Sequence, residues 1–430
     1  MTDTIFAPAT ASGRAGVGII RISGPRAHAI GRNLCGSLPE PRVAALRSLR
    51  DADGAVIDQA LVLVFAAGAS FTGEDVVELH HHGSVAVVAR VLDVLSAQDG
   101  ARPAKAGEFT RRSLDNGVLD LSQVEGLADL IDAETEEQRR QALRVMDGEL
   151  SRLVQGWRRD LQRSAALIEA TIDFADEDVP VNVWPEVRQL LSGVALEIAD
   201  QLSGADAARQ VQTGFEVAIV GRPNSGKSSL INRLSRRDIA LTSDIAGTTR
   251  DVIEARLVVA GQLVTFLDTA GLRETEDVVE RLGIDRARSR AATADLRIFL
   301  LEQGQSMPDS SVAVQDGDII LIGKDDDGDL GGISSRTGVG IDTLLETIAD
   351  RLRDLTSGAS LLIRERHKVA MDSSASALRS ALIRLEQDEP LAELVAADVR
   401  TGITALDELI GRIGVEDVLG EIFSSFCIGK

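Results

Sequence analysis

The sequence predicts a multidomain chain: an α+β N-terminal domain, then an α-helical bundle domain that is interrupted by an inserted α/β domain. Three observations predict this. The 430 residues are enough for two or three separate cores. Strand-like and helix-like runs alternate up to about residue 115, and long helical runs follow on both sides of a strand–glycine loop–helix segment. The expected domains are 1–116, then 117–211 with 356–430, and the insert 212–355.

Residues 1–115 predict a small antiparallel sheet with helices. Strands are expected at 17–22, 60–65 and 76–80, and helices at 27–34 and 85–97. The triplet His80-His81-His82 raises the question of a metal site. In a strand His80 and His82 share a face while His81 points away, and no third ligand is evident. A polar strand end is the favoured interpretation.

From residue 119 to about 172 the apolar pattern is helical. Its apolar positions fall at heptad-like spacing with charges between them, which predicts a seam inside a helical bundle: Leu143, Leu150, Val154, Trp157, Leu161 and Ile168. An acidic loop is expected at 174–180. Further helices are expected at 187–203, 341–354, 366–387, 390–413 and 416–423.

The inserted domain begins with a phosphate-binding pattern. The apolar run Phe215–Val220 leads into G-x-x-x-x-G-K-S at Gly221–Ser228, which opens a helix. Backbone N–H groups of such a loop bind phosphate oxygens, helped by the helix N-terminus. Lys227 would reach the β- and γ-phosphates, and Ser228 would place its hydroxyl on Mg²⁺. A plain surface glycine loop would not explain the motifs that follow.

Those motifs complete the phosphate half of a nucleotide site. Gly247–Asp251 lies in a loop before the alternating run 252–259, so that Thr249 can close on Mg²⁺ and the γ-phosphate. A short apolar strand, 263–267, ends at Asp268, which is placed to hold Mg²⁺ through its water shell. Gly271 can offer its N–H to the γ-phosphate.

A guanine-specific loop follows the strands at 296–301 and 319–322. The carboxylate of Asp326 can accept two N–H bonds from guanine, and adenine cannot supply that pair of donors. GTPases of the translational type carry Asn-Lys-x-Asp in this loop, and this chain has Gly323 in place of the Asn. We therefore expect weaker affinity for the nucleotide, with the preference for guanine retained through Asp326. A Gly323→Asn variant is expected to bind GTP more tightly. The residues expected to bind GTP are Asn224, Ser225, Gly226, Lys227, Ser228, Ser229, Ser243, Asp244, Ile245, Ala246, Gly247, Thr248, Thr249, Asp268, Thr269, Ala270, Gly271, Lys324, Asp326, Ser334, Ser335 and Arg336.

Composition limits the class of protein. The net charge of −21 argues against a surface that coats nucleic acid generally, although a local basic path for RNA remains open. The longest apolar run, 60–67, has the length of a strand, and the N-terminus lacks the layout of a signal peptide. Cys35 and Cys427 encode no disulfide framework or zinc cluster. We expect a soluble, cytoplasmic chain without a membrane partner.

These motifs together resemble the MnmE or TrmE family of tRNA uridine-modifying GTPases, and the match spans the whole chain. The motifs are T-I-F-A-x-A-T at 4–10, G-R-x-G-V-G-I-I-R-I-S-G at 13–24, S-F-T-G-E-D at 70–75, R-P-A-x-x-G-E-F-T at 102–110, L-D-L at 119–121, D-L-I-D-A at 129–133, D-I-A-G-T-T-R-D at 244–251 and F-C-I-G-K at 426–430. The terminal Cys-x-Gly-Lys is highly specific when it is joined to an internal GTPase domain.

The resemblance implies a homodimer formed through the N-terminal domain, where a tetrahydrofolate one-carbon derivative binds. It also implies a flavoprotein partner of the MnmG or GidA type that uses FAD and NADH, in a heterotetramer or larger assembly. Together they install an aminomethyl or carboxymethylaminomethyl group at C5 of the wobble uridine of tRNA. Arg21 and Glu78 match the folate-contacting positions, and Lys430 matches the lysine that reaches that pocket. Val118 replaces a family lysine near the folate, which puts affinity in question.

The resemblance also implies how GTP is hydrolysed. Leu272 stands where Ras-type GTPases place a glutamine, and an apolar side chain cannot orient the attacking water. Glu280 matches the family's catalytic glutamate, acting as general base or through a bridging water; by itself it would be interpreted as a solvated carboxylate. K⁺ would supply charge as an arginine finger does, once two GTPase domains meet. Its matched ligands are Asn224, Ser243, Ile245 and Thr248.

Cys427 has two interpretations that the residues leave open. Beside a folate pocket it would act as a nucleophile or acid/base on C6 or C5 of uridine; elsewhere it would be a small buried side chain.

Two other functions compete with tRNA modification. One is a GTP switch that chaperones ribosomal RNA assembly, which leaves residues 1–115 and the terminal motif unexplained. The other is a scaffold that binds GTP without hydrolysing it.

Overall fold

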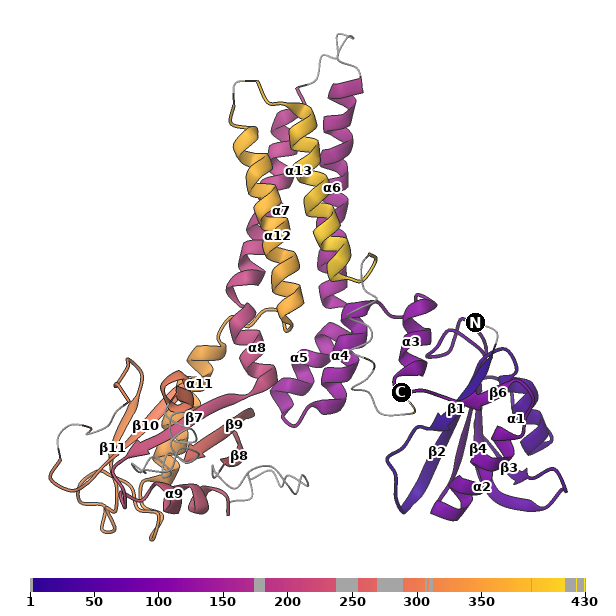
Figure 1. Cartoon of the computed structure of the whole chain (residues 1–430), viewed down its shortest axis with the longest axis horizontal. Coiled ribbons are helices and arrows are strands. Elements are labelled where there is room, and N and C mark those ends of the chain that lie inside the picture. Colours follow the sequence, from indigo (N-terminus) through magenta and orange to yellow (C-terminus); the bar gives the residue numbers. More distant parts are fainter. Residues whose placement is uncertain are drawn as a thin grey trace, which may run out of the picture. The chain divides into compact units, whose positions relative to one another are not determined.

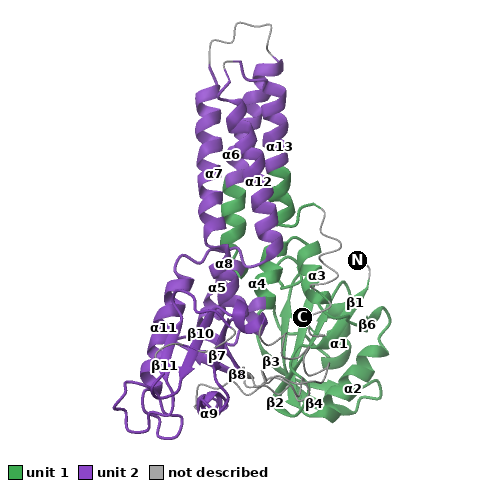
Figure 2. Ribbon diagram, turned by 60° about the vertical axis from the view of Figure 1, so that its left-hand side comes forward, with its two compact units in different colours: residues 1–128, 146–156, 403–430 green, residues 129–145, 157–402 purple. Residues whose placement is uncertain are grey.

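The computed structural model describes residues 3–173, 182–236, 254–268, 289–305, 308, 312–387, 389–413, 423 and 429. The chain divides into two compact units (Figure 2). One contains residues 1–128, 146–156 and 403–430, and the other contains residues 129–145 and 157–402.

The first unit is built on a six-stranded sheet with the order β3-β4-β5-β2-β1-β6. All neighbouring strands are antiparallel except β1 and β6, which are parallel. The predicted small antiparallel sheet was therefore too small. It lacked β1, which was expected only as a lead into a loop, β3, which is rich in arginine, and β6, which has only three residues and ends in proline. The strands are β1 Thr4–Pro8, β2 Ala15–Ser23, β3 Ala45–Arg50, β4 Val56–Phe65, β5 Val76–Gly83 and β6 Ala101–Pro103.

The two faces of this sheet differ. Helices α1 (Ala27–Cys35) and α2 (Val85–Ser96) cover one face, and the core between them includes Ile20 and Ile22 (Figure 1). Because side chains alternate along a strand, Arg21 lies on the opposite face, directly across from its neighbour Glu78 on β5. Helix α3 (Glu108–Asp115) closes part of that second face with the buried ring of Phe109.

The histidine triplet follows the same alternation. His81 is buried on the core face, where its ring lies against Gly18. His80 and His82 share the opposite face, as predicted. They contact the carboxylates of Glu78 at 3.3 Å and Asp58 at 2.8 Å, respectively.

The predicted helical region contains more helices than expected. The heptad interpretation was wrong at Leu143, because the chain turns at Gly148, with φ of 78°, and places Leu143 on α5. The other five seam positions, from Leu150 to Ile168, all lie on α6 and are buried. The loop at 174–180 and the helix at 416–423, apart from Phe423, lie outside the described residues. The helices are α4 Leu121–Asp132, α5 Glu136–Met146, α6 Glu149–Asp173, α7 Trp184–Ser203, α8 Ala205–Thr213, α12 Glu365–Arg384 and α13 Ala392–Leu409.

The second unit contains a five-stranded sheet with the order β11-β10-β7-β9-β8. Its strands pair in parallel except for the β8–β9 hairpin. The continuous apolar runs of β7, β9 and β10 are buried on both faces, as is typical of parallel sheets, whereas β8 alternates and the edge strand β11 is only partly buried. Helices α9 and α11 contribute Leu230, Ile231 and Leu344 to the core. The elements are β7 Phe215–Gly221, α9 Lys227–Leu234, β8 Glu254–Val259, β9 Gln262–Asp268, β10 Leu296–Leu301, β11 Ile319–Ile322 and α11 Ile341–Thr356.

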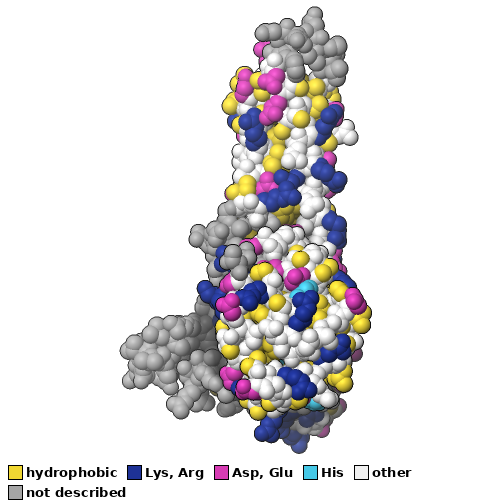
Figure 3. Space-filling view, turned by 90° about the vertical axis from the view of Figure 1, so that its right-hand side faces the viewer, with side chains coloured by type: hydrophobic (Ala, Val, Ile, Leu, Met, Phe, Trp, Pro, Cys, Tyr) yellow, Lys and Arg dark blue, Asp and Glu magenta, His cyan; other side chains and the backbone are white. Residues whose placement is uncertain are grey.

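The described surface shows mixed charge. In the view of Figure 3, lysine and arginine side chains are interspersed with acidic and hydrophobic ones. None of the helices among the described residues combines the length and apolar character needed to cross a membrane.

Candidate functional site

The phosphate loop connects the central strand β7 to helix α9. Gly221 must lack a side chain, because a Cβ there would lie 2.6 Å from the carbonyl oxygen of Leu300. Asn224 and Gly226 have left-handed backbones, with φ of 67° and 104°. These two turns bring the N-terminus of α9 to the end of the strand, which is the arrangement that binds phosphate.

Lys227 and Ser228 point into this loop. The Nζ of Lys227 donates to the carbonyl oxygens of Gly221 and Arg222, both at 2.8 Å. Burial lowers the pKa of Lys227, while the negative charge of Asp268 opposes that shift. Phosphate oxygens would replace these carbonyls with charged acceptors, which form stronger hydrogen bonds.

The two predicted Mg²⁺-binding groups lie together. The hydroxyl of Ser228 donates to Oδ2 of Asp268 at 2.6 Å, at the end of β9. Asp268 is buried. A hydroxyl and a carboxylate beside a phosphate loop are the oxygen ligands that Mg²⁺ prefers, so these residues fit the ion.

The guanine loop contacts the phosphate loop through Gly323. A Cβ at Gly323 would lie 2.7 Å from the carbonyl oxygen of Ser225, so glycine allows the two loops to pack directly together. An Asn side chain at Gly323 would have to push the Ser225 carbonyl aside, which argues against the expected tighter GTP binding by Gly323→Asn; the affinity itself stays a prediction. Lys324 follows with a left-handed backbone, at φ of 60°, and is exposed.

Asp326 is the carboxylate available to a base. It accepts from the hydroxyl of Ser334 at 2.5 Å and from Nη2 and Nε of Arg336 at 2.6 and 2.9 Å. The bonds from Arg336 and Ser334 hold the pKa of Asp326 below its usual range, so it stays an ionised acceptor. The neighbouring Asp325 is buried and instead accepts backbone N–H bonds within its own loop.

The structure thus brings the described residues that were predicted to bind phosphate and base to the carboxyl ends of β7, β9 and β11. Ser225 is buried, Ser229 is exposed, and Ser335 directly follows the buried Ser334. Several predicted residues lie outside the described part of the chain: Ser243, Asp244, Ile245, Ala246, Gly247, Thr248, Thr249, Thr269, Ala270, Gly271, Leu272, Glu280, Cys427 and Lys430.

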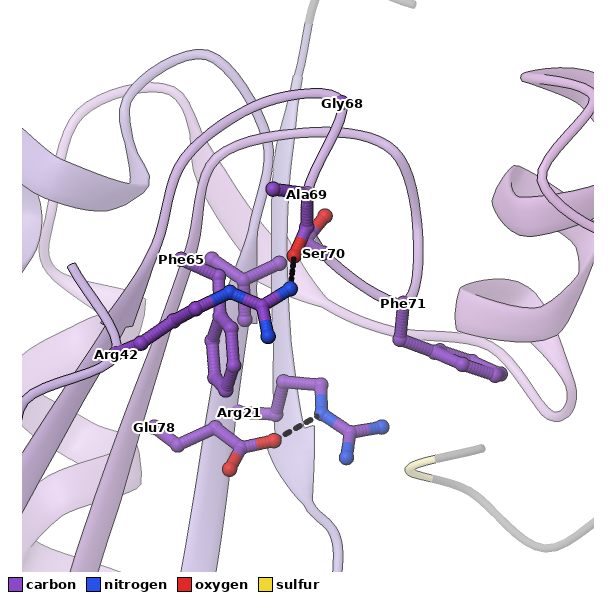
Figure 4. A pocket seen from close by; sticks show the side chains of 9 residues that line it. Arg21, Arg42, Phe65, Gly68, Ala69, Ser70, Phe71 and Glu78 are labelled. Carbon is purple, nitrogen blue, oxygen red and sulfur yellow. Dashed lines mark hydrogen bonds and ion pairs between the residues drawn. The ribbon is translucent and has the colours of Figure 1, made fainter.

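A second pocket lies in the first unit, on the sheet face opposite α1 and α2. It is a cavity of about 410 Å³, within the usual size of small-molecule sites. Nε of Arg21 donates to Oε1 of Glu78 at 2.9 Å (Figure 4). The guanidinium of Arg21 also lies over the rings of Phe71 and Phe109, at 5.5 and 5.6 Å from their centroids. The two predicted folate positions therefore meet in one pocket. Its lining is Arg21, Arg42, Phe65, Gly68, Ala69, Ser70, Phe71, Val76 and Glu78.

A buried ion network supports this pocket, and the sequence did not reveal it. Arg112 on α3 is fully buried and donates to both oxygens of Glu74, at 2.9 and 3.2 Å, and to Asp3 at 3.0 Å. Glu74 belongs to the loop that carries Phe71, while α3 carries Phe109. The network therefore fixes both rings that stack on Arg21. Only the folded chain brings residues 3, 74 and 112 together.

The chain's C-terminal segment reaches the same unit. Phe423 is buried beside Gly107 and packs with Leu121 and Val124. Gly429 has a φ of 107°, and a Cβ there would lie 1.8 Å from the carbonyl oxygen of Pro8. The glycine of the terminal Cys-x-Gly-Lys therefore lies against the end of β1, and no other residue fits there.

Two family models match the chain. Residues 4–118 match the GTP-binding protein TrmE N-terminus, and residues 121–427 match the MnmE helical domain. Proteins called tRNA modification GTPase MnmE from Roseobacter denitrificans and Cereibacter sphaeroides are each 55% identical, over 432 and 430 residues, with all of both chains covered. Among solved structures, Aquifex aeolicus Era bound to GDP and AlF₄⁻ is 23% identical. It covers 41% of this chain and 69% of its own, with a TM-score of 0.24.

Proposed function

The chain belongs to the MnmE family of tRNA modification GTPases, and from this premise we propose that it couples GTP hydrolysis to modification at C5 of the wobble uridine of tRNA. The one-carbon unit comes from a tetrahydrofolate derivative bound in the N-terminal cavity. A flavoprotein partner supplies the FAD and NADH chemistry. The observation that carries the proposal is that one chain holds both a guanine-type phosphate loop and, in its N-terminal unit, a cavity in which Arg21 pairs with Glu78.

GTP binding is assigned to the inserted domain, 212–355. Lys227 exchanges its two loop carbonyls for the β- and γ-phosphates, and Ser228 and Asp268 hold Mg²⁺, directly and through water. Mg²⁺ supplies positive charge against the phosphates. Asp326 accepts the N–H groups of guanine and so excludes adenine.

Hydrolysis is assigned to residues of the family pattern. Glu280 acts on the attacking water, and K⁺ supplies charge at the phosphates once two GTPase domains meet. Asn224 is exposed in the phosphate loop with a left-handed backbone, which supports its accessibility to an ion there. Its proposed partners as K⁺ ligands are Ser243, Ile245 and Thr248, and Thr249 completes the Mg²⁺ site.

Folate binding is assigned to the N-terminal domain, 1–116. Glu78 accepts hydrogen bonds from the N–H groups of the pterin ring, and Arg21 holds that carboxylate in place. Lys430 reaches the same pocket, which the contact of Gly429 with Pro8 supports. Cys427 stays a candidate either for chemistry on uridine or for packing.

The functional assembly is proposed as a homodimer in the cytoplasm that recruits the flavoprotein and tRNA. Leu46 and Leu61 are paired on neighbouring strands of the uncovered sheet face and are 59% and 49% exposed. Apolar side chains in that arrangement support contact with a second copy of the sheet. The helical domain, 117–211 with 356–430, connects the two sites.

A GTPase assay in different salts tests the hydrolysis proposal. We expect GTP turnover in K⁺ and much slower turnover in Na⁺, because the smaller ion fits the proposed oxygen ligands poorly. Absence of turnover in either salt would favour a scaffold that binds GTP without hydrolysing it.

Removal of the last four residues tests the tRNA proposal. The truncated chain should still hydrolyse GTP, whereas wobble uridines from cells that carry it should lack the C5 group by mass spectrometry. Unchanged modification would favour the ribosomal RNA chaperone instead.

A further inference from the structure

The charges that line the N-terminal cavity do not balance. Its lining contains three ionisable side chains, and Arg21 is paired with Glu78 at 2.9 Å. The third is Arg42. Within the part of the chain that the structure describes, Arg42 has no carboxylate within 4.0 Å. Its guanidinium donates to the carbonyl oxygen of Ala69 at 2.8 Å and lies 5.9 Å from the ring of Phe65. The cavity therefore carries one unmatched positive charge.

The backbone of Arg42 is unusual. Its φ is 64°, a left-handed conformation that residues with a Cβ seldom adopt and that glycine adopts freely. The backbone is held there by its N–H bond to the carbonyl oxygen of Val64 at 2.8 Å. Strain of this kind concentrates at ligand-binding positions, where it aims a side chain. Here it aims the guanidinium across Phe65 to the loop that carries Ala69 and Ser70 (Figure 4).

We propose that Arg42 binds a carboxylate at the anionic end of the ligand, which, resting on the proposed folate function, is a carboxylate of the glutamate tail. A guanidinium forms two parallel hydrogen bonds with a carboxylate, and Arg42 has only a neutral carbonyl partner to give up. The Arg21–Glu78 pair, which lies apart from Arg42 in Figure 4, is then available to bind the pterin ring of the folate.

Calorimetric titration of the full-length chain tests the proposal with two probes: 5-formyltetrahydrofolate, and its diamide, in which both glutamate carboxyls are neutral amides. We expect the wild type to prefer the charged probe about tenfold, since a charged hydrogen bond is stronger than a neutral one and solvent weakens both. Arg42→Gly should bind the charged probe about tenfold less tightly and the diamide within twofold. Arg42→Lys should be intermediate.

Two controls separate charge from folding. Arg42→Gly suits the left-handed backbone, so its melting temperature should not fall below that of the wild type. Arg47→Ala removes another exposed arginine that donates to backbone carbonyls outside the cavity, and it should change neither affinity.

The role of Arg42 would be overturned by any of three results for Arg42→Gly: an equal loss of affinity for both probes, a lower melting temperature, or unchanged affinity for the charged probe. Binding of neither probe by the wild type would instead overturn the folate function, and this inference with it.

Discussion

The nucleotide site and the N-terminal cavity satisfy their polar groups in opposite ways. In the nucleotide site the side chains predicted to bind the ligand pair with other groups of the same site: Lys227 with two carbonyls of its own loop, Ser228 with Asp268 at the end of β9, and Asp326 with Arg336 of a later loop. In the cavity, aromatic rings and a buried ion network hold Arg21 and Glu78 in place, and Arg42 keeps an unmatched charge.

The difference reflects where each site is built. The nucleotide site lies on loops at the ends of parallel strands, which can rearrange as bonds to a ligand replace bonds within the protein. In the cavity, the Arg21–Glu78 pair lies on neighbouring strands of a sheet face, which hold these two side chains in place before a ligand arrives. We therefore expect GTP to reorganise its site, folate to enter a preformed one, and changes in one site to spare binding at the other.

The largest expected effect is on base recognition. Asp326→Asn should weaken GTP binding by about 100-fold or more, because an amide cannot accept both guanine N–H groups, and it should favour xanthosine triphosphate. Titration with fluorescent nucleotides measures this, with Asp327→Asn on the same loop as the control. The affinity for folate should be unchanged. If Asp326→Asn also weakened folate binding, the two sites would not bind their ligands independently.

The matching change in the cavity is Arg21→Ala. It leaves Glu78, whose side chain is 14% exposed, without its cation, so we expect folate affinity to fall by about 30-fold. Calorimetry measures the affinity, and the rate of GTP hydrolysis in K⁺ serves as the control because it should not change. Undiminished folate binding would show that the pair does not form the site.

A smaller effect is expected where the two loops of the nucleotide site touch. Gly323→Ala adds a Cβ 2.7 Å from the Ser225 carbonyl, so GTP affinity should fall by about tenfold. Gly156→Ala, on helix α6 with open space around it, is the matched glycine control. Tighter GTP binding by Gly323→Ala or Gly323→Asn would mean that the loops are not packed as described.

The smallest effect is expected at Arg336, which is largely exposed. Arg336 was expected to bind GTP, but in the structure it pairs with Asp326. Arg336→Ala should therefore tighten GTP binding by less than about fivefold, because guanine no longer has to displace the guanidinium from Asp326 and exposed ion pairs contribute little. The pH dependence should move as well. Because Arg336 lowers the pKa of Asp326, the carboxylate stays ionised to lower pH in the wild type. As the pH is lowered, GTP binding by Arg336→Ala should therefore begin to weaken at a higher pH than GTP binding by the wild type, measured by the same titration. The same pH dependence in both proteins would contradict the pairing of Arg336 with Asp326.

Sequence patterns predicted the nucleotide domain better than the N-terminal one. Continuous apolar runs predicted β10 and β11 to the residue, and motif spacing identified Lys227, Ser228 and Asp326. These features are local in the chain. The Arg112 network and Arg42 depend on contacts between distant segments, and Arg42 carries no motif. The sequence also drew attention to Gly323, but the closeness of this residue to the Ser225 carbonyl, which argues against tighter GTP binding by Gly323→Asn, appears only in three dimensions.

The central claim is that the guanine-binding loop and the N-terminal cavity serve one tRNA modification. The most direct test is mass analysis of wobble uridine in cells that lack this chain, complemented with wild type, Asp326→Asn or Arg21→Ala. The account predicts that the C5 group is lost without the chain, returns with wild type, and stays absent or strongly reduced with either variant. Normal C5 modification in cells that lack the chain would contradict it.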